Sequence, residues 1–399
     1  MEFIDIEEYN YPLPEKQIAL FPTNNREYSK LLIYKDNDIT DSNFSQIHNY
    51  INKNSLLILN DTKVFNARFI LKKKTGSEIE IFCLEPAEAN KSFEFLEIKT
   101  EIVIKCFIGN AKKWKNETLS INNNKITLEA SLINKSDEYY LVKFSWNDSS
   151  LTFYDITEIF GKTPLPPYIK REPIKDDKQR YQTVYAKNKG SVAAPTAGLH
   201  FTPDILNKLK SENIKIEYIT LNVGAGTFKP ITTQNVLQHN MHTENFTINI
   251  SLLETILKHK DSITAVGTTS LRTLESLYWI GYKAILNNNL NDLFIDQWEV
   301  YKYTDTNKFS FDDIILNLIK LLKQLNITQL VGATKIMIVP GYKFKVVNTL
   351  ITNFHQPKST LLLLIAAFIG NDWRNIYNYA LTNNYRFLSY GDSSILYCK

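Results

Sequence analysis

The stretch SITAVGTTSLRTLESLYWI, residues 262–280, decides the fold class of this chain. Its pattern predicts a strand, a turn at Gly267 and then a helix, because apolar side chains recur at helical spacing after the glycine. The predicted apolar face of the helix consists of Leu271, Leu274, Leu277 and Tyr278. A strand that passes directly into a helix is the repeating unit of α/β proteins, so this stretch predicts a sheet with helices packed on it.

Further stretches repeat the alternation of strand and helix. KIEYITLNVGAG (215–226) predicts a strand that enters a glycine turn, and DDIILNLIKLLKQL (312–325) predicts an amphipathic helix. TKIMIVPGY (334–342) predicts another strand. NTLITNFHQPKSTLLLLIAAFIG (348–370) predicts a strand, a loop and a buried helix with Gly370 as its C-cap. We therefore expect an α/β fold in which helices pack on a mixed sheet.

Residues 67–150 have a different pattern. Short alternating runs such as SEIEIFCLE and YYLVKFSW follow one another, and turn residues separate them at the spacing of a small barrel or sandwich. We expect an inserted β-barrel domain at 67–150, while 1–66 and 151–399 form an α/β catalytic domain. The barrel region carries almost no glycine loops or histidines, which favours a role in scaffolding or RNA contact.

Composition places the chain among globular proteins. It has 399 residues, of which 44% are hydrophobic, and a net charge of +4, which permits an RNA partner without requiring one. Its three cysteines form no CxxC pair, which fits a reducing compartment. The acidic start lacks an apolar signal segment, and the longest apolar run, 361–369, is too short to span a bilayer. We expect a cytoplasmic protein with no membrane partner, present as a monomer or homodimer.

Two loops after predicted strands carry small or polar residues. Gly224 and Gly226 lie in NVGAGTF, where closely spaced glycines let a backbone wrap a ligand, although a plain tight turn also explains them. Thr268 and Thr269 lie at a predicted helix start, where unpaired N–H groups bind anions, and ordinary N-capping is the alternative. Because α/β folds place ligands at such loops, all four are candidate cofactor-binding residues.

The loop TNFHQPKST (352–360) is a candidate anion site. It places His355 and Lys358 just before Ser359, the predicted N-cap of an apolar helix. A cation beside a helix start holds a carboxylate or a phosphate, although lone histidines are more often structural. We take these three residues as further candidates for cofactor binding.

Two other stretches contain candidate acid–base groups. HNMHTE contains His239, His242 and Glu244; its generic spacing is weak evidence for a metal site, and acid–base work by one histidine that Glu244 orients fits equally well. SVAAPTAGLHFT (191–202) combines small residues with His200. Small residues let a backbone approach a ligand, and we expect His200 to face that ligand.

A proline segment and the stretch after it interleave basic and aromatic residues. GKTPLPPYIKR (161–171) is stiff and extended, and DKQRYQTVYA (177–186) predicts a short helix with Tyr181 and Tyr185 on one face. Binding of single-stranded RNA uses this combination, although tyrosines at this spacing more often pack in a core. The candidate RNA-binding residues are Lys170, Arg171 and Arg180.

Taken in order, these stretches resemble the S-adenosylmethionine:tRNA ribosyltransferase-isomerases of queuosine biosynthesis. The resemblance rests on NREYSKLL, NDTKVFNAR, GKTPLPPYI, RYQTVYA, GSVAAPTAGLHFT, VGAGTFKPI, HNMHTE, VGTTSLRTLES, PGYKF, TNFHQPKSTLLLL and YRFLSYGD. These matches cover nearly the whole chain, and the longer ones are very specific. The fold of that family, an α/β domain with an inserted β-barrel, agrees with the pattern of the residues.

The resemblance implies an unusual use of S-adenosylmethionine as a co-substrate. Members transfer its ribosyl part to 7-aminomethyl-7-deazaguanine at the wobble position of a tRNA and release adenine and methionine. The ribose rearranges, which gives epoxyqueuosine. We expect His200 or His242 to transfer protons, with Glu244 orienting His242. His355 and Lys358 are expected at the methionine carboxylate, and no metal is expected.

Departures from the family pattern leave alternatives open. Asn222 stands where the family usually has His before VGAGTF, and residues 282–312 differ from typical members. One alternative is a paralogue that uses the same cofactor on another nucleoside. A second is an RNA-binding protein without catalysis. The least favoured is a metal hydrolase built on His239, His242 and Glu244.

Overall fold

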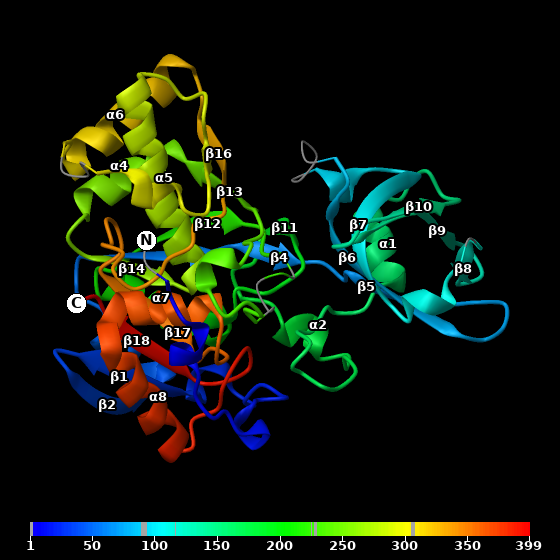
Figure 1. Ribbon diagram of the computed structural model, residues 1–399, viewed down its shortest axis with the longest axis horizontal. Helices are drawn as coiled ribbons and strands as arrows, with labels where there is room; N and C mark the ends of the chain where they lie inside the picture. Colours follow the sequence, from blue (N-terminus) through cyan, green and yellow to red (C-terminus); the bar gives the residue numbers. More distant parts are fainter. Residues whose placement is uncertain (1–2, 89–93, 116, 225, 227–229, 305–307) are drawn as a thin grey trace.

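The chain folds into a large mixed sheet with packed helices and a separate closed barrel, which confirms the predicted fold class (Figure 1). The barrel lies to one side of the sheet, beside the short parallel pair β4 (Thr62–Val64) and β11 (Asn188–Ser191). The computed structural model describes residues 3–88, 94–115, 117–224, 226, 230–304 and 308–399.

The large sheet has the strand order β15-β16-β13-β12-β3-β14-β17-β18-β1-β2. Its strands are β1 (Lys30–Lys35), β2 (Asp38–Asn43), β3 (Leu56–Asn60), β12 (Lys215–Leu221), β13 (Glu244–Asn249), β14 (Ile263–Val266), β15 (Phe294–Ile295), β16 (Gln329–Thr334), β17 (Thr349–Asn353) and β18 (Ser393–Tyr397). The four central strands β12, β3, β14 and β17 are parallel to one another. Their carboxyl ends therefore meet at one edge of the sheet, where open α/β sheets bind ligands.

Hydrophobic cores lie on both faces of the sheet. In β3, Leu56 and Ile58 belong to one core, whereas Leu57 and Leu59 belong to the other, as the alternation of side chains along a strand requires. The first core also contains α4 (Ile250–Lys258), α5 (Thr268–Asn287), α6 (Phe311–Gln324), α7 (Thr360–Ile369) and α8 (Trp373–Thr382). The second contains α3 (Pro203–Ser211). Residues 268–284 of α5 are buried all round, so the predicted apolar face is one side of a central helix.

The barrel closes in the order β10-β7-β6-β5-β8-β9. Its antiparallel strands are β5 (Arg68–Lys72), β6 (Glu78–Pro86), β7 (Glu101–Gly109), β8 (Leu119–Asn122), β9 (Thr127–Lys135) and β10 (Tyr140–Trp146). Helix α1 (Phe153–Phe160) packs on the barrel, because Phe153 lies in the same core as Phe69 and Phe144. We therefore propose that the inserted unit extends past position 150 and includes α1.

Two predicted elements differ from the structure. The strand predicted at 334–342 is wrong: β16 ends at Thr334, and the next residues bond irregularly, through the amides of Lys335 and Met337 to the carbonyls of Ile295 and Gln297, while residues 336–339 are buried. A run of apolar residues in the sequence predicts that the segment is buried, but it does not predict whether the segment pairs with a neighbouring strand. The helix predicted at 177–186 is also too long, because α2 (Asp177–Arg180) ends before Tyr181. Among the described helices, none is long and apolar enough to cross a membrane.

Candidate functional site

A cleft lies at the carboxyl ends of the central parallel strands and contains about 710 Å³ of space not filled by protein atoms. Its walls come from segments far apart in the chain, namely residues 194–197, 267–269, 352–356, 359, 361 and 388–389, with Tyr168 and Val223. The structure thus brings together the polar loops after β14 and β17, as predicted from their place after strands. Small-molecule ligands bind at this place in α/β folds.

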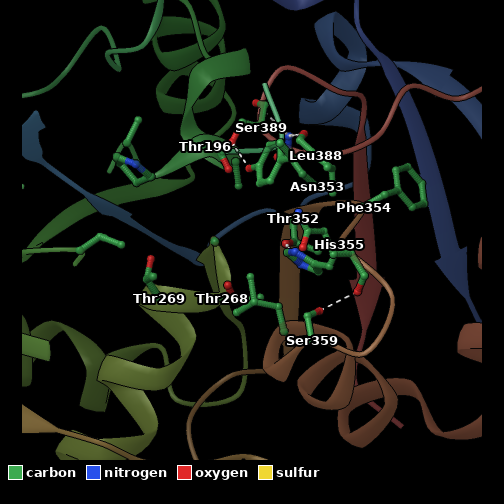
Figure 2. A pocket seen from close by; sticks show the side chains of 18 residues that line it. Thr196, Thr268, Thr269, Thr352, Asn353, Phe354, His355, Ser359, Leu388 and Ser389 are labelled. Carbon is green, nitrogen blue, oxygen red and sulfur yellow. Dashed lines mark hydrogen bonds between the residues drawn. The ribbon is translucent and has the colours of Figure 1, made fainter. Parts of the chain in front are cut away.

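The starts of two helices converge on this cleft (Figure 2). Thr268 and Thr269 form the first turn of α5 after Gly267, whose φ of 89° favours glycine. Ser359 is the N-cap of α7, and its Oγ accepts a hydrogen bond from the amide of Leu362 at 3.2 Å. The first turn of a helix leaves N–H groups without intrahelical partners and carries a positive partial charge. The cleft is therefore suited to a negatively charged group.

His355 lines the cleft but carries no positive charge there at neutral pH. Its Nε2 lies 3.0 Å from Oγ1 of Thr352, and its backbone amide donates to the hydroxyl of Tyr377. Burial lowers the pKa of His355 to about 3. Its imidazole therefore offers one N–H donor or one lone pair, according to its tautomer.

Lys358 lies outside the cleft walls. Its Nζ forms an ion pair with Glu7 at 2.6 Å, and its backbone amide donates to the carbonyl of Tyr9. The residue has a φ of 54°, in the left-handed region, so the chain turns at this point. Through these contacts Lys358 holds the N-terminal segment against the loop before α7, instead of pointing into the cleft as expected.

His200 is buried one layer behind the cleft. It is 5% exposed, its Nδ1 lies 2.8 Å from Oγ of Ser29, and its ring packs against Phe44. Burial lowers the pKa of His200 to about 4, against a smaller opposing effect of the Asn353 side chain. Asn353 itself lines the cleft and donates to the carbonyl of Leu388. The structure thus places His200 beside a cleft residue, in a neutral state.

A second, smaller hollow with about 340 Å³ of open space adjoins the cleft, and Leu361 lines both. It contains His239, His242, Glu244 and Arg272, so the HNMHTE stretch meets the first turns of α5. Glu244 is buried and pairs with Nη1 of Arg272 at 2.7 Å. Burial lowers the pKa of His239, with a smaller effect of His242.

Glycines shape the wall beside these histidines. A Cβ at Gly226 would lie 1.9 Å from Cδ2 of His242, so only glycine allows this close approach. At Gly224 a Cβ would meet nothing within 4 Å, and this position is open. That Gly226 lets the backbone wrap a ligand stays a prediction, since its described close neighbour is His242 of the same chain.

Gln297 holds the histidine loop in place. Its Nε2 donates to the carbonyl of His239 at 2.6 Å, and its Oε1 accepts from the amide of Met241 at 2.9 Å. Gln297 is buried, at 6% exposure. Sequence reasoning missed it, because it lies in the 282–312 segment that shares no motif with the loop it holds.

The three candidate RNA-binding residues differ in their surroundings. The guanidinium of Arg171 forms a two-pronged ion pair with Asp177 at 2.6 and 2.8 Å, and Arg180 donates to the carbonyls of Thr23 and Asn24. These bonds give both arginines a role in holding the fold. Lys170 is 73% exposed and pairs with Glu15 at 2.6 Å, at the surface, where solvent makes such a pair weak. It lines a groove between the barrel and the proline segment.

Other cleft residues were not singled out from the sequence, although most lie inside the matching stretches. They are Tyr168, Thr196, Thr352, Asn353 and Ser389, to which the smaller hollow adds Arg272. Asn222 lies outside both hollows; its Oδ1 accepts from Thr62, and its side chain fills the place of a Cβ at Gly190. Across the described ranges, no group of three or more His, Cys, Asp or Glu side chains is placed to hold a metal ion.

The fold and the cleft define an α/β protein with a cleft suited to an anionic ligand at the carboxyl edge of its sheet, and with a barrel inserted in the chain. A family model described as "Queuosine biosynthesis protein" matches residues 6–396, and the chain belongs to this family.

Curated relatives match over the full length. The chain is 37% identical to an S-adenosylmethionine:tRNA ribosyltransferase-isomerase of Sulfurihydrogenibium sp., over 98% of this chain and 99% of the relative. It is 35% identical to a protein of the same name from Nitrosomonas europaea, over 98% and 96%. A solved S-adenosylmethionine tRNA ribosyltransferase from Thermotoga maritima is 24% identical over 98% of this chain and 99% of its own, with a TM-score of 0.46.

Proposed function

We propose that this protein transfers the ribosyl part of S-adenosylmethionine to 7-aminomethyl-7-deazaguanine at the wobble position of a tRNA and isomerises it to epoxyqueuosine, releasing adenine and methionine. The proposal is supported by membership of the queuosine biosynthesis family and by relatives of that name along the whole chain. The observation that carries it is the meeting of two helix starts in one cleft at the carboxyl edge of the sheet. Such a site suits the methionine carboxylate of the cofactor.

In this proposal the cofactor lies in the cleft. The first turns of α5 and α7, with Thr268, Thr269 and Ser359, bind its carboxylate through backbone N–H groups. His355 contributes a neutral hydrogen-bonding group, since burial keeps its pKa far below neutral pH. Gly224 gives backbone room beside Val223, which lines the cleft.

Proton transfer falls to His242 in this proposal. His242 is exposed at the smaller hollow, and Glu244 is two residues further on, buried against Arg272. A positioned histidine transfers protons with a gain of roughly a hundred- to ten-thousand-fold in rate. His200 acts through Asn353 as a positioning residue, because burial keeps it neutral and behind the cleft wall.

The tRNA is proposed to contact the groove between the barrel and the proline segment, where Lys170 is the exposed candidate. Arg171 and Arg180 support this face through their intramolecular bonds. Each phosphate contact that is lost should make the salt dependence of binding shallower by about one unit of slope. We further propose that the reaction takes place in the cytosol and needs no metal, so adenine release should persist in the presence of a chelator.

The test is direct. Purified protein is incubated with S-adenosylmethionine and tRNA that carries 7-aminomethyl-7-deazaguanine, and free adenine and the modified nucleoside are measured. Unmodified tRNA is the control, since it lacks the aminomethyl group. We expect adenine only with the modified tRNA. Folded protein that binds both substrates and releases no adenine would overturn the proposal.

A further inference from the structure

Arg272 has one nitrogen that the fold does not use. The residue is 4% exposed; its Nε donates to the carbonyl of Ile336 at 3.1 Å, and its Nη1 donates to Glu244 at 2.7 Å. Its Nη2 is buried and has no hydrogen-bond partner within the part of the chain that the structure describes. A buried donor without a partner is costly, so an unused nitrogen of a charged group at a hollow indicates a ligand.

Arg272, which carries this nitrogen, is one of the residues that line the smaller hollow, next to the cleft. Arg272 lines this hollow with Thr360 and Leu361, and Leu361 also forms part of the cleft wall. Arg272 follows Thr268 by four residues on α5, so both side chains lie on the same side of the helix. A ligand in the smaller hollow would therefore lie beside a ligand in the cleft, as the substrates of one transfer reaction do.

The charge at this place selects the kind of ligand atom. Glu244 is 3% exposed and already balances the charge of Arg272 through their ion pair. A carboxylate or phosphate at Nη2 would come close to the carboxylate of Glu244, and repulsion would cancel much of its attraction to the guanidinium. A neutral carbonyl oxygen gains the same charge-assisted hydrogen bond without this repulsion.

We propose that Nη2 of Arg272 binds the carbonyl oxygen of the acceptor nucleobase, 7-aminomethyl-7-deazaguanine, in the smaller hollow. This inference rests on the proposed function, which places the cofactor in the cleft and leaves the adjoining hollow for the second substrate. Arginine is the usual partner of the guanine carbonyl, and base-modifying enzymes read an extruded base by hydrogen bonds to its edge. Arg272 thus sets the preference for a guanine-type acceptor.

The test compares a protein change with a matching change in the RNA. Arg272→Lys keeps a positive charge beside Glu244 and removes Nη2. The RNA probes are two anticodon stem-loops, one with 7-aminomethyl-7-deazaguanine at the wobble position and one whose base lacks the carbonyl oxygen. Ser276→Ala is the control variant, because Ser276 of α5 lines neither hollow; the change removes its hydrogen bonds to Thr334 of β16 and to the backbone carbonyl of Arg272 and leaves the guanidinium of Arg272 in place.

We expect wild-type protein and Ser276→Ala to bind the normal stem-loop about ten- to a hundred-fold more tightly than the carbonyl-free one, as suits a hydrogen bond to a charged group. Arg272→Lys should bind both RNAs equally weakly and keep its affinity for S-adenosylmethionine. If Arg272→Lys does not fold, the affinities of wild-type protein for the two stem-loops still test the inference. Equal binding of both RNAs to wild-type protein, or a loss of cofactor affinity alone in Arg272→Lys, would overturn the inference. This test measures RNA binding, whereas the test of the proposed function measures adenine release. A protein that releases no adenine would therefore count against the proposed function, and the binding of the two RNAs would still test the role of Arg272.

Discussion

Acidification should destabilise this protein through two buried histidines, His200 and His355. Burial lowers the pKa of His200 from an ordinary value of 6.5 to about 4, and that of His355 to about 3. A lowered folded pKa favours the neutral ring, so this stability is complete above pH 6.5 and is lost as the pH falls toward the folded pKa. Each ring then costs about 1.4 kcal/mol for every pH unit below 6.5. Near pH 5 the two together remove about 4 kcal/mol.

Urea unfolding, followed by tryptophan fluorescence, measures this effect near pH 7.5 and near pH 5. His200→Gln and His355→Gln lack the titrating ring, whereas the carboxylates remain and cancel in the comparison with wild type. On acidification, the difference in free energy of unfolding should shift by about 2 kcal/mol in favour of each variant. His48→Gln, which removes a half-buried histidine outside both hollows, is the control. A difference that is the same at both pH values would refute the neutral, buried state of these rings.

Three further predictions concern the site and the barrel. Lys358→Ala should leave the KM for S-adenosylmethionine within about two-fold of wild type, because its charge is matched by Glu7 at the surface, and steady-state kinetics would show a larger rise if the residue held the cofactor. Gln297→Ala should lower kcat for adenine release more than it weakens binding of either substrate, since it frees the histidine loop; unchanged kcat would show that the loop needs no clamp. Phe153→Ala should cost about 3 to 5 kcal/mol and loosen the barrel before the sheet, as hydrogen exchange would report; equal loosening of both would contradict α1 as part of the barrel core.

Local sequence patterns predicted the fold well where the structure of an element depends on its own residues and not on a distant partner. The strand and helix on either side of Gly267 and those of the 348–370 stretch form as expected, and Gly370 ends α7 as its C-cap. The alternating runs formed the barrel. The prediction of a strand through residues 335–339 failed, because a strand also needs a neighbouring strand to pair with. The apolar residues of this run are buried without such regular pairing.

The site was predictable in place but only partly in detail. Thr268, Thr269, His355 and Ser359 line the cleft, because the position of a loop after a parallel strand fixes its place in the sheet. Lys358 does not, since its side chain meets Glu7, which lies 351 residues away in the chain. Spacing within a loop cannot reveal such a distant partner, and the same holds for the contact of Gln297 with the histidine loop.

The position of β18 has a consequence for how the protein is made. This last strand lies between β17 and β1 in the sheet, and it pairs with both. During synthesis the hairpin of β1 and β2 leaves the ribosome first, yet it has no place in the sheet until the final residues appear. Leu388 and Ser389, which complete the cleft wall, also arrive just before that strand. A nascent chain therefore cannot bind its ligand early, and loss of the last few residues should release the first hairpin along with the last strand.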